Sequence, residues 1–287
     1  MSLHILSLET SSAWCGVALL RGLVDASSPV ALISREHQGV QEHSARLLPM
    51  IDEVLAEAGI ARSAIDAIAF GQGPGGFTGL RVACGVAQGL GFALDRPVLP
   101  VVSHAAVAVQ AQGTAGQPIV VAMDARMQEV YVAAYAQPSG GEQQVLLAPQ
   151  LMALEGLDEW LGQTFGQTPG TLPRGVPDAG DAIGDAIVAD AEPASTGWWL
   201  AGDAAAAYPD AFAGVAAAQH VPDAVRPTAS AVAMLARRAW LRGEAIAPEL
   251  AMPLYVRDKV AFTTAERLLG AGGNPKVAPA APVGEGA

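Results

Sequence analysis

The amino-terminal part of the chain alternates short apolar runs with polar turns. Residues 3–8 and 14–20 are apolar, and a polar run at 9–12 separates them. Two such runs joined by a short polar turn are typical of a β-hairpin. A loop at 27–29 then precedes an apolar run at 30–34, where we predict a third strand.

Between residues 42 and 59 the apolar positions recur with the period of a helix. Gly59 suits the left-handed C-cap that ends many helices. Pro49 lacks a backbone N–H, so we expect the helix either to begin near it or to kink there. The apolar stripe consists of Leu47, Leu48, Ile51, Val54 and Leu55.

The remaining sequence alternates predicted strands with predicted helices. Strands are expected at 64–70, 97–102, 119–122, 129–135 and 198–201, and helices at 80–94, 104–111 and 228–240. Residues 163–196 show no period and are interpreted as a long loop or insertion. A hairpin followed by alternating strands and helices predicts a mixed α/β chain with two lobes. No internal sequence repeat is evident.

Composition and charge narrow the functional classes. The formal net charge is −12, and only two of the 16 basic residues are lysines. Such an acidic surface repels phosphate backbones, which argues against nucleic-acid binding by the chain alone. Cys15 and Cys84 lie in apolar segments, and we expect two buried free thiols. The start of the chain lacks the features of a signal peptide, and the longest uncharged stretch is interrupted by Pro and Gly, so we predict a soluble cytoplasmic protein.

The glycine-rich stretch at 71–79 follows a predicted strand and opens a predicted helix. Backbone N–H groups in such a turn can bind an anion, and a tight turn without a ligand is the other interpretation. Thr78 is the expected N-cap. Arg81 would lie in the first turn, where a positive charge does not favour the helix dipole, so we expect it to make a functional contact or a salt bridge. Gly71, Gly73 and Gly76 also match the dinucleotide pattern GxGxxG, with Asp95 at a suitable distance. A P-loop is excluded because no lysine follows the glycines.

Two further turns and the histidines complete the candidate chemistry. The run Glu9-Thr10-Ser11-Ser12 and the pair Gly202-Asp203 each follow a strand and could either approach a ligand or cap a turn. The five histidines lack metal-ligand spacing, and no nucleophilic triad is recognisable. His104 is expected to cap its helix or to lie near the surface.

The motifs resemble those of the bacterial TsaB (YeaZ) family, which takes part in tRNA threonylcarbamoyladenosine (t6A) biosynthesis. The resemblance covers most of residues 3–135 and returns at 200–260. The most specific string is Gly-Pro-Gly-Gly-Phe-Thr-Gly-Leu-Arg at 73–81. It is supported by residues 5–11, 16–19, 43–51, 124–126, 129–131 and 253–257.

The resemblance implies the two-lobed actin/Hsp70/sugar-kinase-like (ASKHA) fold and a pseudo-enzyme. The catalytic paralogue TsaD binds a metal through two histidines spaced as His-x-x-x-His. Here His104 fills the first position, whereas Ala108 replaces the second. We therefore expect no catalytic residue, no metal and no required cofactor, with at most weak ATP or ADP contact. The residues expected to make such a nucleotide or phosphate contact are Glu9, Thr10, Ser11, Gly73, Gly75, Thr78, Arg81, Gly202 and Asp203.

The resemblance also implies that the helices near residues 43 and 78 pair with those of a TsaD-like subunit. Leu47, Met50 and Val54 would form a partner-facing line beside the core line of Leu48, Ile51 and Leu55; the alternative is that both lines are core. Small residues after residue 80 would allow close approach. The predicted partner-binding residues are His43, Arg46, Leu47, Met50, Val54, Ala83 and Ala87.

The resulting hypothesis is a non-catalytic scaffold and activator for N6-threonylcarbamoylation of adenosine 37 in tRNAs that read codons beginning with A. It would act with a TsaD-like transferase and a TsaE-like ATPase, contact tRNA only through the complex, and form a homodimer when alone. Alternatives are an active small-molecule kinase of the same superfamily and an NAD-dependent oxidoreductase. We divide the chain into an amino-terminal lobe (1–102, with helix 228–241 packed back on it), a second lobe (103–227, with the insertion 163–196), a C-terminal helix and return segment (228–269) and a disordered tail (270–287).

Overall fold

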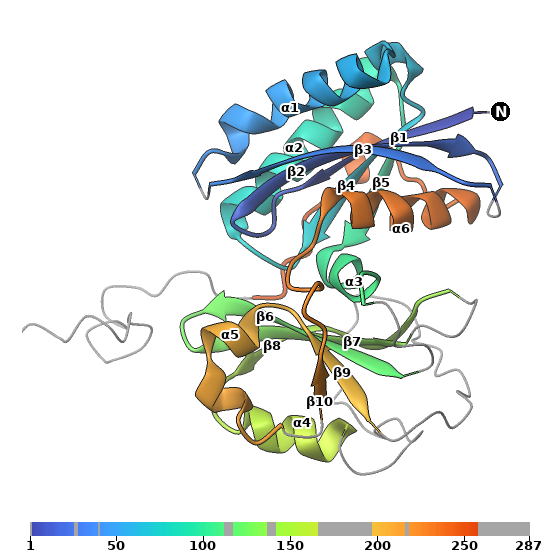
Figure 1. Cartoon of the computed structure of the whole chain (residues 1–287). Coiled ribbons are helices and arrows are strands. Elements are labelled where there is room, and N and C mark those ends of the chain that lie inside the picture. The colour runs from blue at the N-terminus through green and yellow to red at the C-terminus, as the bar shows by residue number, and fades with distance from the viewer. Residues whose placement is uncertain are drawn as a thin grey trace, which may run out of the picture.

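The structure, a computed structural model, describes residues 2–25, 28–39, 41–111, 117–136, 142–165, 197–215 and 218–257. Within these residues the strands form two five-stranded sheets, one in each lobe (Figure 1). The upper sheet has the order β3-β2-β1-β4-β5, and the lower sheet has the order β10-β9-β6-β7-β8. This confirms the mixed α/β fold with two lobes.

The upper sheet is built from the predicted hairpin and two parallel strands. Its strands are β1 (Ser2–Glu9), β2 (Trp14–Leu23), β3 (Ala31–Gln38), β4 (Ala67–Gly73) and β5 (Val98–Val102). β1 pairs antiparallel with β2 and parallel with β4. One face is covered by α1 (His43–Ala58) and α2 (Phe77–Leu94), and the other by α6 (Ala229–Leu241).

The lower sheet repeats this topology. Its strands are β6 (Pro118–Arg126), β7 (Glu129–Ala136), β8 (Gln144–Ala153), β9 (Trp198–Ala201) and β10 (Ala218–His220). β6 pairs antiparallel with β7 and parallel with β9, as β1 does with β2 and β4. One face packs against α4 (Leu157–Phe165), α5 (Ala204–Ala207) and the 3₁₀ turn η2 (Pro209–Phe212). The duplication is therefore visible in the strand order although the sequence shows no repeat.

The lobes are joined by α3 (Ser103–Ala108), which lies between them (Figure 1). Ala106 belongs to the core of the upper lobe, whereas Val107 and Ala108 belong to that of the lower lobe. A second crossing runs from β10 to α6. A third follows the 3₁₀ turn η3 (Pro248–Leu250), which packs on α2. The short turn η1 (Arg62–Ala64) precedes β4.

Several local predictions are confirmed. Gly59 adopts the left-handed conformation after α1, and Thr228 accepts the N-capping hydrogen bond from Ala231. Cys15 and Cys84 are buried free thiols. The proposed division into four segments stays a prediction.

Other local predictions were wrong. α1 begins at His43 and contains Pro49, so the expectation that the helix begins near this proline is wrong, whereas the alternative of a kink there stays a prediction. α2 begins three residues earlier than expected, with Gly76 rather than Thr78 as its N-cap. The strands β8 and β10 and the helix α4 were missed, and α4 includes residues 163–165 of the expected loop. The remainder of the expected insertion (166–196), the end of the expected return segment (258–269) and the expected tail (270–287) lie outside the described residues.

Candidate functional site

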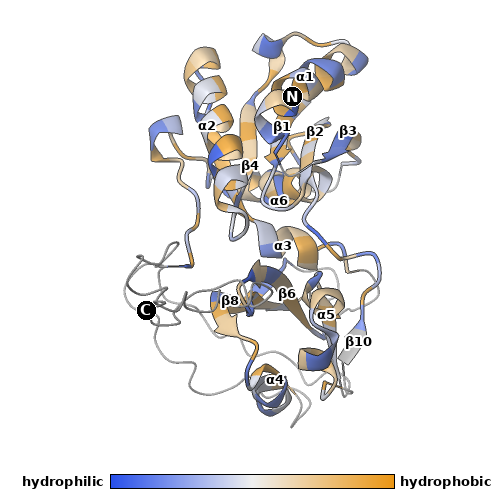
Figure 2. Cartoon of the chain, turned by 90° about the vertical axis from the view of Figure 1, so that its left-hand side faces the viewer, coloured by the Kyte–Doolittle hydropathy of each residue, from blue (hydrophilic) through white to orange (hydrophobic). Residues whose placement is uncertain are grey.

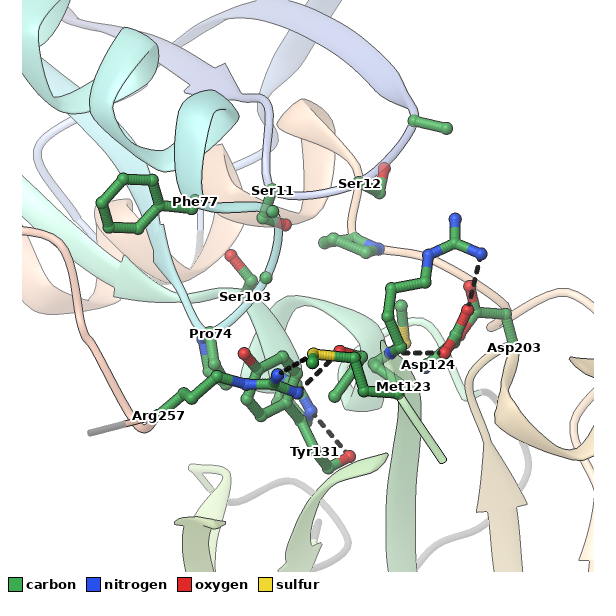
Figure 3. A pocket seen from close by; sticks show the side chains of 18 residues that line it. Ser11, Ser12, Pro74, Phe77, Ser103, Met123, Asp124, Tyr131, Asp203 and Arg257 are labelled. Atoms are coloured by element: carbon green, nitrogen blue, oxygen red, sulfur yellow. Dashed lines mark hydrogen bonds and ion pairs between the residues drawn. The ribbon is translucent and has the colours of Figure 1, made fainter. Parts of the chain in front are cut away.

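A cleft of about 390 Å³ lies between the two lobes. Figure 3 shows it lined from above by the turns after β1 and β4, and from below by the turn between β6 and β7. Its walls include Ser11, Ser12, Pro74, Gly75, Phe77, Ser103, Met123, Asp124, Tyr131, Asp203 and Arg257. Of the nine residues predicted for nucleotide or phosphate contact, three line the cleft: Ser11, Gly75 and Asp203.

Glu9 lies just behind the cleft and is almost completely buried. One carboxylate oxygen accepts a hydrogen bond from the backbone N–H of Ser11 (2.6 Å), and the other accepts one from the hydroxyl of Ser103 (2.9 Å). Burial raises the pKa of Glu9, and these hydrogen bonds oppose the rise. Glu9 therefore fastens the turn that follows β1 rather than pointing into the cleft.

The glycines at 71–79 allow the chain to pack against itself. A Cβ at Gly71 would overlap the Glu9 carboxylate, and one at Gly75 or Gly79 would overlap the carbonyl oxygen of Ser11 or Thr10. The Thr10 hydroxyl also donates to the carbonyl oxygen of Gly79 (2.7 Å). This close packing supports the interpretation as a tight turn and argues against a dinucleotide lying over these glycines.

Four backbone N–H groups around the cleft are engaged within the chain. Those of Gly73 and Gly76 donate to the Ser103 hydroxyl (3.2 Å) and the Ser11 carbonyl (2.7 Å). Across the cleft, those of Asp124 and Arg126 donate to the carboxylates of Asp203 (2.8 Å) and Asp124 (2.7 Å). A phosphate bound by these four groups would have to displace their hydrogen bonds and approach a carboxylate.

Asp203 and Asp124 form one acidic cluster in the lower lobe. Gly202 before Asp203 has φ 102°, and a Cβ there would overlap the Ala122 carbonyl oxygen. Asp124 also accepts a hydrogen bond from Tyr208 (2.8 Å) and pairs with Arg126 (3.1 Å). Burial raises the pKa of Asp203, and the Asp124 charge adds to that rise. Arg126 therefore forms a local ion pair with this cluster through Asp124.

Arg81 has partners within the chain. Its guanidinium lies 3.8 Å from the ring centre of Phe77, and its Nε donates to the hydroxyl of Tyr255 (2.9 Å). Arg81 and Thr78 do not line the cleft. The contact that the sequence left open for Arg81 is therefore with the C-terminal segment.

His104 is fully buried, contrary to the expectation of a cap or surface position. Its Nε2 lies 3.2 Å from the carbonyl oxygen of Tyr131, and burial lowers its pKa to about 4. The helix α3 begins at Ser103 and its apolar residues pack into the cores of both lobes, so His104 is buried between them. Among the described residues no group of three or more His, Cys, Asp or Glu side chains is placed to hold a metal.

The structure corrects the predicted partner-binding residues. Leu47, Met50, Val54, Ala83 and Ala87 belong to the core of the upper lobe, and His43 is also buried, against the Ser12 carbonyl. The side chain of Arg46 is about half exposed. Positions 47, 50, 51, 54 and 55 form the single stripe that faces the sheet, and Leu48 lies outside it with 51% of its surface exposed.

A different apolar surface is exposed on the same two helices. Leu48 on α1 and Phe92 on α2 are exposed, and α2 also carries Gly85 and Gly89, whose Cβ positions meet nothing within 4 Å. α2 is long and apolar enough to span a membrane by length and composition, but only a third of it is buried in the lobe. Figure 2 shows α2 at the edge of the upper lobe with much of its length coloured hydrophobic. We call this surface the α1–α2 face. The small residues after residue 80 were its signal in the sequence.

Comparisons with known proteins agree with these features. The sequence model of the family described as "TsaD: tRNA N6-adenosine threonylcarbamoyltransferase" matches residues 33–264. The chain is 27% identical to the tRNA threonylcarbamoyladenosine biosynthesis protein TsaB of Escherichia coli over 91% of this chain and 97% of that protein. It is 45% identical to TsaB of Haemophilus influenzae, over 45% of this chain and about half (52%) of that relative's length.

The solved structure of YeaZ from Pseudomonas aeruginosa has the same architecture. It superposes with a TM-score of 0.63 at 35% identity, covering 88% of this chain and 99% of YeaZ. The resemblance carried by the sequence motifs is thereby confirmed. The chain belongs to the TsaB (YeaZ) family.

Proposed function

We propose that this chain is a non-catalytic subunit of the t6A machinery that binds and activates a TsaD-like transferase through the α1–α2 face. The reaction supported is N6-threonylcarbamoylation of adenosine 37 in tRNAs that read codons beginning with A. A TsaE-like ATPase completes the assembly, which works in the cytoplasm, and tRNA is contacted only through the complex. The curated relatives are named as biosynthesis proteins of this nucleoside.

The observation that carries the proposal is the exposure of α2. On this 18-residue helix, whose single charged residue is Arg81, only a third of the residues are fully buried, and Phe92 is 62% exposed. Leaving such a surface in water is unfavourable, and contiguous exposed apolar patches mark sites of association. The open ridge at Gly85 and Gly89 allows another helix to approach closely. Since the TsaD model matches α1 and α2 as well, a TsaD-like partner offers a helix pair of related shape. Without that partner the same face supports a homodimer.

The proposed absence of catalysis is supported by the hydrogen bonds that the acidic residues around the cleft make within the chain. Glu9, Asp124 and Asp203 already accept the amides of the turns that face the cleft. Among the described residues, these carboxylates are therefore not free to act as a general base beside a bound phosphate. We propose that the chain requires no cofactor and makes at most weak contact with ATP or ADP.

Substitution of Gly85 tests the binding surface. Gly85→Gln places a side chain in open space, so the isolated chain should remain folded and gain helix stability by roughly 0.5–1 kcal/mol. At a close helix contact the same side chain should weaken binding of the TsaD-like protein by about tenfold or more in calorimetry. Gly162→Gln is the matched control, because Gly162 is also helical and open but lies in α4 of the other lobe. Equal affinity of both variants would remove the α1–α2 face from the interface.

Activity provides the second test. The purified chain with threonylcarbamoyl-adenylate and tRNA should form no modified nucleoside, and addition of the TsaD-like and TsaE-like proteins should produce it. Nucleoside mass spectrometry of digested tRNA gives the answer. Turnover by the chain alone would contradict the proposed pseudo-enzyme.

A further inference from the structure

The third crossing between the lobes is a short extended segment, residues 251–257, which we call the strap. Figure 2 shows it running beside α2 from the upper lobe down to the lower lobe. Its first residues follow η3, which packs on α2, and its last described residue is Arg257. The strap thus touches both the proposed partner helix and the cleft.

The upper half of the strap is fixed to α2 and to the end of β4. The carbonyl oxygen of Ala251 accepts a hydrogen bond from Gln88 (3.0 Å), and the N–H of Leu254 donates to the carbonyl of Gln72 (2.7 Å). Tyr255 packs against Phe77, with ring centres 5.7 Å apart, and its hydroxyl accepts a hydrogen bond from Arg81. These contacts hold the strap along the whole side of α2.

The lower end is fixed to the turn between β6 and β7. The Arg257 guanidinium donates to the carbonyl of Ala125 (2.8 Å) and forms an ion pair with Glu129 (2.6 Å). The Arg257 side chain is only 14% exposed, so the pair is less screened by solvent than a surface pair. Figure 3 shows Arg257 reaching into the cleft on the side away from Asp203.

The turn that Arg257 holds has an unusual backbone. Arg126, Met127 and Gln128 have φ of 65°, 60° and 61°, three successive left-handed residues without a glycine. Such a conformation persists where surrounding contacts impose it. Arg257 supplies three of those contacts: Ala125 and Glu129 flank the three residues, and the sulfur of Met127, 3.0 Å from the guanidinium, belongs to them.

The strap also extends the α1–α2 face. Met252 of the strap is 71% exposed, and Leu250, the last residue of η3 before the strap, is 62% exposed. Pro248 of the same turn lies against Gly91 of α2. A subunit seated on α2 would therefore bury strap residues together with the helix. Its binding would stabilise the strap in the position that lets Arg257 reach the β6–β7 turn.

We infer that the strap couples the α1–α2 face to the β6–β7 turn, with Arg257 and Tyr255 as positioning residues, so that partner binding and the order of the cleft depend on each other. The partner half of this inference rests on the proposed function. The coupling within the chain does not, and it can be measured on the isolated protein.

Hydrogen exchange on the isolated chain tests the internal coupling. Arg81→Gln and Arg257→Gln should both speed amide exchange in residues 124–130 by about fivefold or more, although Arg81 makes no contact there. Arg62→Gln is the control, since Arg62 is an exposed arginine of the same lobe paired with Asp52. Unchanged exchange in the Arg81 variant, or equal acceleration in the Arg62 variant, would overturn the coupling.

Affinity for the TsaD-like protein tests the partner half. Arg257→Gln and Glu129→Gln should each weaken binding by about fivefold, and the double variant should be no weaker than Arg257→Gln alone, because both remove one ion pair. If Gly85→Gln weakens binding but Arg257→Gln binds the TsaD-like protein with wild-type affinity, the proposed link between partner binding and the strap is overturned. If Gly85→Gln also binds normally, the proposed surface fails, and the exchange result still decides whether the strap links the lobes.

Discussion

Two neighbouring leucines on α1 offer a direct test of which side of that helix is core. Leu47 is fully buried among the side chains of the upper lobe, whereas Leu48 is 51% exposed. The same substitution, leucine to alanine, can be made at both positions. The helix, the chemical change and the distance from the cleft are therefore matched, and only the direction of the side chain differs.

The expected magnitudes follow from burial. Leu47→Ala removes buried methyl groups and leaves a cavity, which should lower the free energy of unfolding by about 2–5 kcal/mol. Leu48→Ala should lower it by less than about 1 kcal/mol, because half of that side chain is already in water. Burial of the exposed half in a complex contributes about 1 kcal/mol, so Leu48→Ala should weaken partner binding about fivefold.

Urea denaturation followed by circular dichroism measures the stability, and titration calorimetry with the TsaD-like protein measures the affinity. The folded fraction of Leu47→Ala should bind the partner as the wild type does. The reasoning is refuted if Leu47→Ala keeps the wild-type midpoint but loses affinity, or if both variants lose the same stability.

Three further outcomes are expected. Burial disfavours the charged form of His104 and lowers its pKa from 6.5 to about 4 in the folded chain. The free energy of unfolding should therefore fall as the pH drops from 6.5 toward 4, by up to about 1.4 kcal/mol per pH unit. Urea midpoints at pH 7 and pH 5 should accordingly differ less in His104→Gln than in the wild type. Gly79→Ala would drive a Cβ into the carbonyl of Thr10 and should cost roughly 1–3 kcal/mol in thermal unfolding, whereas Gly85→Ala, with open space, should cost nothing. The guanidinium of the buried Arg237 donates hydrogen bonds to the carbonyls of Leu23, Asp25 and Ser28, in the connection between β2 and β3. Arg237→Met should therefore lower the free energy of unfolding by roughly 2–4 kcal/mol, and a loss below about 0.5 kcal/mol would contradict this.

Local patterns were sufficient for much of the fold. The first hairpin, α1 and α6 each combine a clear period with a cap or turn signal, and these elements occur where the sequence predicts them. β8 was missed because Leu147 is its only fully buried residue, so no strong alternation marks it. α4 was missed because it is short and buries only Leu157 and Leu161.

The candidate site was harder to predict because its properties depend on neighbours distant in sequence. The residues of α1 are apolar over more than half of its circumference, and the pattern does not show which part faces the sheet. Sequence spacing likewise leaves open whether Gly75 and Gly79 approach a ligand or another part of the chain. The answer depends on the turn after β1, 64–69 residues earlier, whose carbonyls occupy that space.

The duplicated topology connects the two turns that face the cleft. β6 occupies the position in the lower sheet that β1 occupies in the upper one, and each ends near an acidic residue, Asp124 or Glu9. In both turns the carboxylate accepts the backbone N–H two residues further on, at Arg126 and Ser11. The same local device therefore fixes both turns through the chain's own atoms. Since the carbonyl of Ser11 in turn accepts the N–H of Gly76, the N-cap of α2, the turn after β1 also fixes the start of the helix that carries the α1–α2 face.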